Sequence, residues 1–204
     1  MMSSGCRTCS INTQARRPER LFGTRSFVRD CMVIAYIGMG SNIGDGKRTL
    51  QDAWKFIGDL DDITLSRLSS PYLSAPVDMV SQHWFTNAVG VVSTSLGPLE
   101  LLHTLLEVEA VFGRTRSETG FGYQDRSLDL DLLYFQEVVM DTPELILPHP
   151  HVGKRLFVLE PLAEVTPDFT VLATGVTVSQ MIQELQQSVH RGESKKQEIS
   201  KSFW

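Results

Sequence analysis

Residues 127–135, with the sequence SLDLDLLYF, are the most informative stretch of the chain. Leucine and aspartate alternate from Leu128 to Leu132, a pattern that predicts a β-strand with one buried face. Successive side chains on a strand point to opposite faces, so Asp129 and Asp131 share one face and the leucines share the other. At about 3.3 Å per residue, the Cα atoms of the two aspartates lie roughly 7 Å apart.

Two carboxylates placed in this way repel each other unless a positive charge lies near both. A divalent cation suits them, because Mg²⁺ prefers carboxylate oxygens and usually takes few protein ligands together with phosphates. For an isolated pair of this kind, the solvated face of an ordinary strand is the commoner explanation. Here Arg114, Arg116 and Arg126 lie just upstream, and guanidinium groups match phosphate oxygens. The acids and arginines together outline a site for a polyphosphate and two metal ions.

The apolar pattern of the chain predicts four strands and two helices in the order βαββαβ. The strands are expected at 33–37, 63–70, 85–94 and 127–135, with one helix between Asp45 and Gly58 and another between Pro98 and Gly113. This order is typical of an α+β, ferredoxin-like fold, with an antiparallel sheet and helices packed on one face. Residues 152–163 are expected to form a short helix and a further packed segment, as part of the C-terminal additions.

Two segments are expected to interrupt the strands. Residues 38–42, GMGSN, should break the first strand. Residues 71–83 should form a loop, because Pro71 and Pro76 lack the N–H that ladder pairing needs.

The second expected helix carries one acidic residue on its apolar side. Glu109 shares a helical face with Leu102, Leu105 and Leu106, since these positions are spaced i, i+3, i+4, i+7. An acid in such a place commonly sits at the helix end and reaches water. Alternatively, it faces a cleft and orients a ligand or a neighbouring side chain.

The boundaries of the domain follow from composition. We expect a disordered N-terminal extension at 1–32, a domain at 33–185 and a polar tail at 186–204 that frays. Residues 1–31 contain six arginines and only two acidic residues, without helical or strand periodicity. The favoured explanation is a start codon assigned too early, with Met32 as the true first residue. A transit peptide is second, and a metal or redox site at Cys6 and Cys9 is a distant third.

Composition also excludes several classes of protein. With 42% apolar and 21% charged residues in 204, the chain can bury a core. A net charge of −5 argues against a nucleic-acid partner, and no apolar run is long enough to predict a membrane span. All three cysteines fall within the first 31 residues, which fits a reducing compartment. We therefore expect a cytoplasmic monomer that binds small molecules.

Taken together, these segments resemble the 6-hydroxymethyl-7,8-dihydropterin pyrophosphokinase family of folate biosynthesis. The resemblance covers roughly residues 33–169. It is carried by AYIGMGSN at 35–42, SSPY at 69–72, Asn87, RSLDLDLL at 126–133, PHP at 148–150 and RLF at 155–157. The most specific part is the Arg-x-Leu-Asp-Leu-Asp run followed later by Pro-His.

The resemblance implies an enzyme that moves pyrophosphate from ATP to 6-hydroxymethyl-7,8-dihydropterin and releases AMP. By this resemblance, Asp129 and Asp131 would hold two Mg²⁺ ions. Arg114 and Arg126 would be the catalytic arginines. The ATP site would comprise Glu109, Arg116, Tyr123, His149 and Arg155, and the pterin site would comprise Ser74, Ala75, Pro76, Val77, Phe85, Asn87 and Phe157.

The sequence departs from the family pattern at several positions. Phe85 stands where a tyrosine is often found, and Leu106 where glutamine can occur. Residues 123–125 replace a familiar Trp-Gly-Pro, and Pro150 replaces an aromatic residue. None of these changes removes the predicted metal ligands or the principal arginines.

A competing function from another class is a non-catalytic ferredoxin-like module that binds RNA. Such a module needs exposed strand aromatics interleaved with basic residues. The acidic body and the aspartate pair argue against it.

Overall fold

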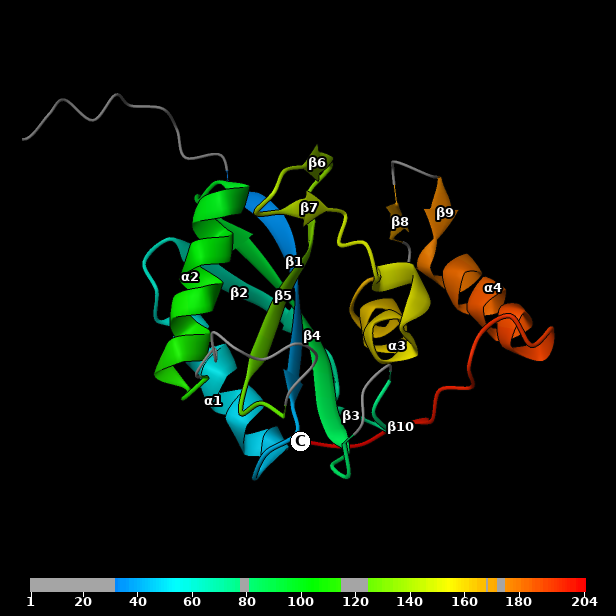
Figure 1. Cartoon of the computed structure of the whole chain (residues 1–204). Coiled ribbons are helices and arrows are strands. Elements are labelled where there is room, and N and C mark those ends of the chain that lie inside the picture. The colour runs from blue at the N-terminus through cyan, green and yellow to red at the C-terminus, as the bar shows by residue number, and fades with distance from the viewer. Residues whose placement is uncertain (1–31, 78–80, 115–124, 168, 172–174) are drawn as a thin grey trace, which may run out of the picture.

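The computed structural model describes residues 32–77, 81–114, 125–167, 169–171 and 175–204. An antiparallel sheet of six strands forms its centre (Figure 1). Its order is β10-β3-β4-β1-β5, and β2 also pairs with β4. The strands are β1 (Val33–Ser41), β2 (Ile63–Leu68), β3 (Tyr72–Ser74), β4 (Phe85–Thr94), β5 (Asp129–Phe135) and β10 (Ile199–Lys201).

The order of elements confirms the predicted α+β fold, with β3 as an additional strand. The strand predicted at 127–135 is β5, which begins two residues later than expected. Ser127 instead turns its hydroxyl toward the Phe112 carbonyl, to which it donates at 2.7 Å.

The predicted break at residues 38–42 is wrong, since β1 continues to Ser41. From Ala35 to Gly40, β1 pairs with β4 on one side and β5 on the other. A strand paired on both sides satisfies its backbone groups, and this outweighs the weak strand propensity of glycine.

The prediction that residues 71–83 form only a loop is also wrong. Residues 72–74 form β3, which pairs with β4 and with β10. Pro71 and Pro76 lie just outside the paired residues, so their missing N–H groups remove no bond from the ladder.

Both predicted helices begin where their capping residues indicate. In α1 (Gly46–Gly58), the Asp45 carboxylate accepts from the Arg48 amide at 3.2 Å. In α2 (Pro98–Val111), Glu100 accepts from the Gly97 amide at 2.8 Å. These carboxylates satisfy N–H groups that have no partner within the helix.

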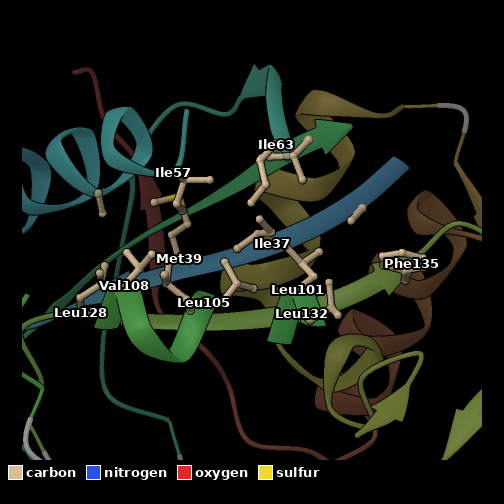
Figure 2. Packing of buried hydrophobic residues seen from close by; sticks show 14 of the residues in the cluster. Ile37, Met39, Ile57, Ile63, Leu101, Leu105, Val108, Leu128, Leu132 and Phe135 are labelled. Atoms are coloured by element: carbon tan, nitrogen blue, oxygen red, sulfur yellow. The ribbon is translucent and has the colours of Figure 1, made fainter. Parts of the chain in front are cut away.

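One hydrophobic cluster joins α1 and α2 to one face of the sheet (Figure 2). Ile57 of α1 and Leu105 of α2 pack there with Ile37 of β1 and Leu132 of β5. Both helices therefore pack on one face, as predicted, and it is the face to which Leu130 and Leu132 of β5 point.

Most of the C-terminal additions cover the opposite face of the sheet (Figure 1). A second cluster there joins Tyr36 of β1 and Val89 of β4 to Leu159 and Leu162 of α3. The additions comprise the β6–β7 hairpin (Met140–Asp141 and Ile146–Leu147), a 3₁₀ turn at Val152–Lys154, α3 (Leu156–Val165), the β8–β9 pair (Thr170–Val171 and Val176–Thr177) and α4 (Val178–His190). Of these, the β6–β7 hairpin packs instead into the first cluster, through Leu145 and Leu147. The short helix and packed segment expected at 152–163 are thus the 3₁₀ turn and α3. In the described part of the chain, no helix has the length and apolar character to cross a bilayer.

The expectation that residues 186–204 fray as a polar tail is wrong. The helix α4 continues to His190, past the boundary expected at 185. Farther on, β10 pairs with β3. The bonds of this pairing are made by backbone groups, so the polar side-chain pattern gave no sign of them. The three explanations offered for the N-terminal extension concern residues 1–31, which lie outside the described residues.

Candidate active site

The two aspartates of β5 lie on the face opposite Leu130 and Leu132. Leu130 and Leu132 are each 2% exposed in the core, whereas Asp129 and Asp131 are partly exposed. On β1, the residues paired with Asp129 and Asp131 are glycines, at positions 40 and 38. Because glycine has no side chain, Gly40 leaves room beside Asp129, whereas the Leu133 side chain fills the space at Gly38.

Burial, together with the neighbouring charge of Asp129, raises the pKa of Asp131 to about 6. Arg155 and Arg126 oppose this effect. A cation beside the pair would favour the charged forms of both carboxylates. No group of three or more Asp, Glu, His or Cys side chains suited to a metal occurs in the described ranges. An ion held here would therefore complete its shell with water or ligand phosphates, as Mg²⁺ usually does.

Two arginines bind opposite oxygens of Asp129. Arg114 donates to Oδ1 at 2.5 Å, and Arg126 lies 2.7 Å from Oδ2. The two arginines flank the segment 115–124, which lies outside the described residues. The aspartate thus holds two guanidinium groups at the place where phosphates would need them.

Glu109 is buried, with 2% of its surface exposed. Its Oε1 accepts from the Leu130 amide at 2.7 Å and also binds Arg114. The alternative in which Glu109 reaches water is therefore wrong. Its carboxylate instead links α2 to β5 and orients Arg114.

We expect Glu109→Gln to lower kcat about tenfold, the order of effect for loss of one charge-assisted contact. Glutamine keeps an acceptor for the Leu130 amide but loses the charge that orients Arg114. Steady-state kinetics would measure the change, with Glu107→Gln on the exposed side of α2 as the control. Equal activity of the two variants would contradict the positioning role.

A first cavity of about 450 Å³ opens beside the aspartates. Its charged lining contains every described residue predicted for the metal ions, the catalytic arginines and ATP: Glu109, Arg114, Arg126, Asp129, Asp131, His149 and Arg155. Residues of α2 and of the β6–β7 hairpin complete it, among them Leu106 and Leu145. Arg116 and Tyr123, also predicted for ATP, lie outside the described residues.

His149 is neutral at physiological pH in this environment. Burial lowers its pKa to about 4, with smaller contributions from Arg155 and His151. A neutral imidazole offers one donor and one acceptor. The His149 Nδ1 accepts from the His151 amide at 3.3 Å. Its Nε2–H can therefore donate to a ligand in the first cavity, while Arg155 carries the positive charge.

A second cavity lies beside the first. It is lined by Gly40, Ser74, Ala75, Val77, Phe85, Asn87, Arg126, Asp129, Asp131, Arg155 and Phe157. All the residues predicted for the pterin are in this lining except Pro76, which lies in the same segment. The amide nitrogen of buried Asn87 donates to the Ser74 hydroxyl at 3.0 Å.

The two cavities share Arg126, Asp129, Asp131 and Arg155. The carboxylate pair therefore lies where the two cavities meet. Ligands bound in the two cavities would come together at the aspartates, which is the arrangement that transfer of a charged group requires.

A hydrogen-bonded group beside the site was not predicted from the sequence. The Asp125 carboxylate accepts from Asn42 at 2.6 Å and from Ser81 at 2.7 Å. Both bonds lower the pKa of Asp125, and the bond from Ser81 has the larger effect. Asn42 also accepts from the Arg126 amide at 2.7 Å. The group fixes the backbone that carries Arg126.

Residues of the β6–β7 hairpin that line the first cavity were also missed. Thr142, Pro143 and Glu144 form its turn region. The only available signal was the proline-rich character of the segment, which indicates a turn but not the cavity it faces.

Comparison with known proteins gives consistent results. A family model described as 7,8-dihydro-6-hydroxymethylpterin-pyrophosphokinase (HPPK) matches residues 36–167. A Bacillus subtilis protein named 2-amino-4-hydroxy-6-hydroxymethyldihydropteridine pyrophosphokinase is 40% identical over 147 residues, which cover 72% of this chain and 86% of that protein. A Methylorubrum extorquens protein of the same name is 36% identical over 157 residues, which cover 77% and 96%.

Solved structures of similar fold include a Plasmodium falciparum HPPK-DHPS triple mutant. It matches with a TM-score of 0.63 and 13% identity, over 82% of this chain and 47% of that one. This chain thus spans about half the length of that protein, and the likeness concerns the fold alone.

Proposed function

The chain belongs to the 7,8-dihydro-6-hydroxymethylpterin-pyrophosphokinase family, and from this we propose that it transfers pyrophosphate from ATP to 6-hydroxymethyl-7,8-dihydropterin with Mg²⁺, releasing AMP. The chain is a pyrophosphokinase, a transferase of folate biosynthesis that acts on small molecules. Membership of an enzyme family leaves no support for the RNA-binding module. One observation carries the finer proposal: the aspartates lie where two cavities of different chemistry meet.

The first cavity suits ATP. Arg114, Arg126 and Arg155 would neutralise its phosphates, since guanidinium groups bind phosphate oxygens in pairs of hydrogen bonds. Apolar side chains such as Leu106 and Leu145 offer a surface for a flat base.

Asp129 and Asp131 would hold Mg²⁺. Their hard oxygen donors, the space at Gly40 beside Asp129 and the nearby arginines fit an ion that shares its shell with phosphates. When bound, Mg²⁺ supplies positive charge that offsets the charge of the triphosphate.

The second cavity suits the pterin. The Asn87 amide nitrogen donates to the Ser74 hydroxyl and to the Tyr72 carbonyl, so its oxygen would accept from the edge of a heterocycle. Phe85 and Phe157 supply apolar surface for its flat faces. Phenylalanine at position 85 provides this surface without a hydroxyl.

The proposed reaction needs no covalent intermediate. The hydroxymethyl oxygen attacks the β-phosphorus of ATP and loses its proton to solvent, the bond from that phosphorus to the AMP oxygen breaks, and AMP leaves. Arg114 and Arg126 would stabilise negative charge during this step, and the two cavities would hold the reactants in place. The proposal extends to a monomeric, cytoplasmic enzyme; the lack of cysteine beyond residue 31 fits a reducing compartment.

The function is tested by AMP formation from ATP and Mg²⁺, with and without 6-hydroxymethyl-7,8-dihydropterin. We expect AMP only when the pterin is present, and chelation of Mg²⁺ should stop the reaction. ATP binding without pterin-dependent AMP would overturn the assignment of the second substrate. Absence of binding by either ligand would overturn both assignments.

A further inference from the structure

The segment 197–204, here called the closing segment, lies beside the strand that borders the second cavity. Its strand β10 pairs with β3, so that Lys201 faces Tyr72. On its other side β3 pairs with β4, and that pairing places Tyr72 opposite Asn87. The three-residue strand that carries Ser74 is therefore held between β4 and the closing segment (Figure 1).

Hydrogen bonds continue the pairing beyond both ends of β3. The Ala75 amide donates to the Glu198 carbonyl at 3.0 Å, and the Ser202 amide donates to the Pro71 carbonyl at 2.8 Å. Trp204 extends the contact, since its indole N–H donates to the Ser69 carbonyl at 2.9 Å. The chain from 69 to 75 thus runs beside the closing segment. Ser74 and Ala75, at the end of this stretch, line the second cavity.

Side chains fix the two ends of the closing segment to other elements. Gln197 accepts from the Leu156 amide at 2.9 Å and donates to the Lys154 carbonyl at 2.8 Å. These two bonds lie on either side of Arg155. At the other end, Lys47 of α1 donates to the Ser202 hydroxyl at 2.8 Å and to the Phe203 carbonyl at 2.6 Å.

Glu164 of α3 adds a third attachment. Its carboxylate accepts from the Tyr72 hydroxyl at 3.0 Å and from the Ser70 hydroxyl at 2.8 Å. Lys201, which faces Tyr72 across the ladder, lies 3.3 Å from the same carboxylate. One residue of α3 therefore binds both the strand of the cavity and the closing segment.

A strand of three residues has few ladder bonds of its own and is marginal when one edge is open. We propose that the closing segment positions the β3 side of the second cavity, with Trp204 and Gln197 as positioning residues for the pterin substrate. It acts by holding Ser74 and Ala75 in the binding arrangement before the ligand arrives. This inference rests on the proposed function, because it takes the pterin as the ligand of the second cavity.

The expected consequence is a selective loss of pterin affinity. If β3 without this support adopts the binding arrangement about a tenth of the time, the apparent affinity falls about tenfold. The lining of the first cavity does not include Ser74 or Ala75. ATP affinity should therefore change little when Trp204 is altered.

The test uses the full chain with Trp204→Ala, Trp204→Phe and Gln197→Ala. Phe203→Ala is the matched control, since the Phe203 side chain is 81% exposed and only its carbonyl receives the Lys47 bond. We expect KM for the pterin to rise about tenfold in Trp204→Ala, with KM for ATP unchanged. KM for the pterin in Trp204→Phe should lie between the values for the unaltered chain and Trp204→Ala, because this variant keeps an aromatic ring but loses the indole N–H. Gln197→Ala should also raise KM for the pterin.

Hydrogen exchange distinguishes positioning from general instability. The Ala75 amide should exchange faster in Trp204→Ala, while amides in α1 and α2 keep their protection. In Trp204→Ala, equal changes in both KM values, or the same pterin KM as in the control, would overturn the inference. If the unaltered chain forms no pterin-dependent AMP, the proposed function itself fails, and this result is distinct from the first two.

Discussion

Asp131→Asn is expected to lower kcat by roughly 10²–10⁴-fold, equivalent to about 3–5 kcal/mol of barrier. The amide keeps the size of the side chain but removes the negative charge and one strong metal ligand. Because we place Mg²⁺ at Asp129 and Asp131, the loss should appear mainly in kcat and in the concentration of Mg²⁺ needed for activity. Steady-state kinetics across a Mg²⁺ series would measure both.

The control for this variant is Asp52→Asn on α1, where the aspartate side chain is 52% exposed. It changes the net charge of the protein by the same amount and lies outside the linings of both cavities. Near-normal turnover by Asp131→Asn at ordinary Mg²⁺ would contradict the assignment of Asp131 as a metal ligand.

Asp131→Asn should also be more stable than the unaltered chain when no metal is present. The folded-state pKa of Asp131 is raised from 3.8 to about 6, chiefly by burial. A carboxyl with a raised folded-state pKa binds protons more tightly in the folded state, so the stability of the unaltered chain falls as pH rises from about 4 to 6. At pH 7, Asp131→Asn removes this penalty, with a gain of up to about 3 kcal/mol. Urea unfolding in a chelator at about pH 5 and pH 7 would measure it.

These opposite changes separate a site residue from a structural one. A residue that only supports the fold would lower stability and activity together. Loss of turnover with increased stability of the metal-free protein indicates instead that the two carboxylates are kept close for binding. An unchanged or reduced stability at pH 7 would show that burial does not destabilise the Asp131 charge.

The chemistry of the site could be predicted where it depends on a local pattern. Alternation placed Asp129 and Asp131 on one face of β5, and the structure has them there. Asp45 and Pro98 marked the starts of α1 and α2, because capping involves residues within one turn of each other. In each case, the determining contacts lie within a few residues along the chain.

The features that could not be predicted depend on contacts between distant residues. The pairing of β10 with β3 joins segments more than a hundred residues apart through backbone groups, which carry no side-chain signature. The continuation of β1 through Gly38 and Gly40 likewise depends on strands on both sides. Glu109 could be placed on the inner face of α2, but its bond to the Leu130 amide required the position of β5.

Arg126→Ala is the second variant for which we expect a large effect, a fall in kcat of about 10²–10³-fold, the range for removal of one group that stabilises transition-state charge. Arg126 lines both cavities and binds Oδ2 of Asp129 at 2.7 Å. The variant therefore removes a positive charge from the junction where the two substrates are proposed to meet. KM for each substrate should rise less than kcat falls, since the charge matters most during transfer.

Arg126→Lys tests whether the charge alone is sufficient. Lysine keeps the charge but lacks the planar fork that binds two oxygens at once, so we expect only partial recovery of kcat. Arg48→Ala is the control, because the Arg48 side chain is 80% exposed on α1 and forms a surface ion pair with Asp52. Single-turnover measurements of AMP would separate transfer from product release. A transfer rate in Arg126→Ala equal to that of Arg48→Ala would show that Arg126 holds Asp129 in place without taking part in transfer.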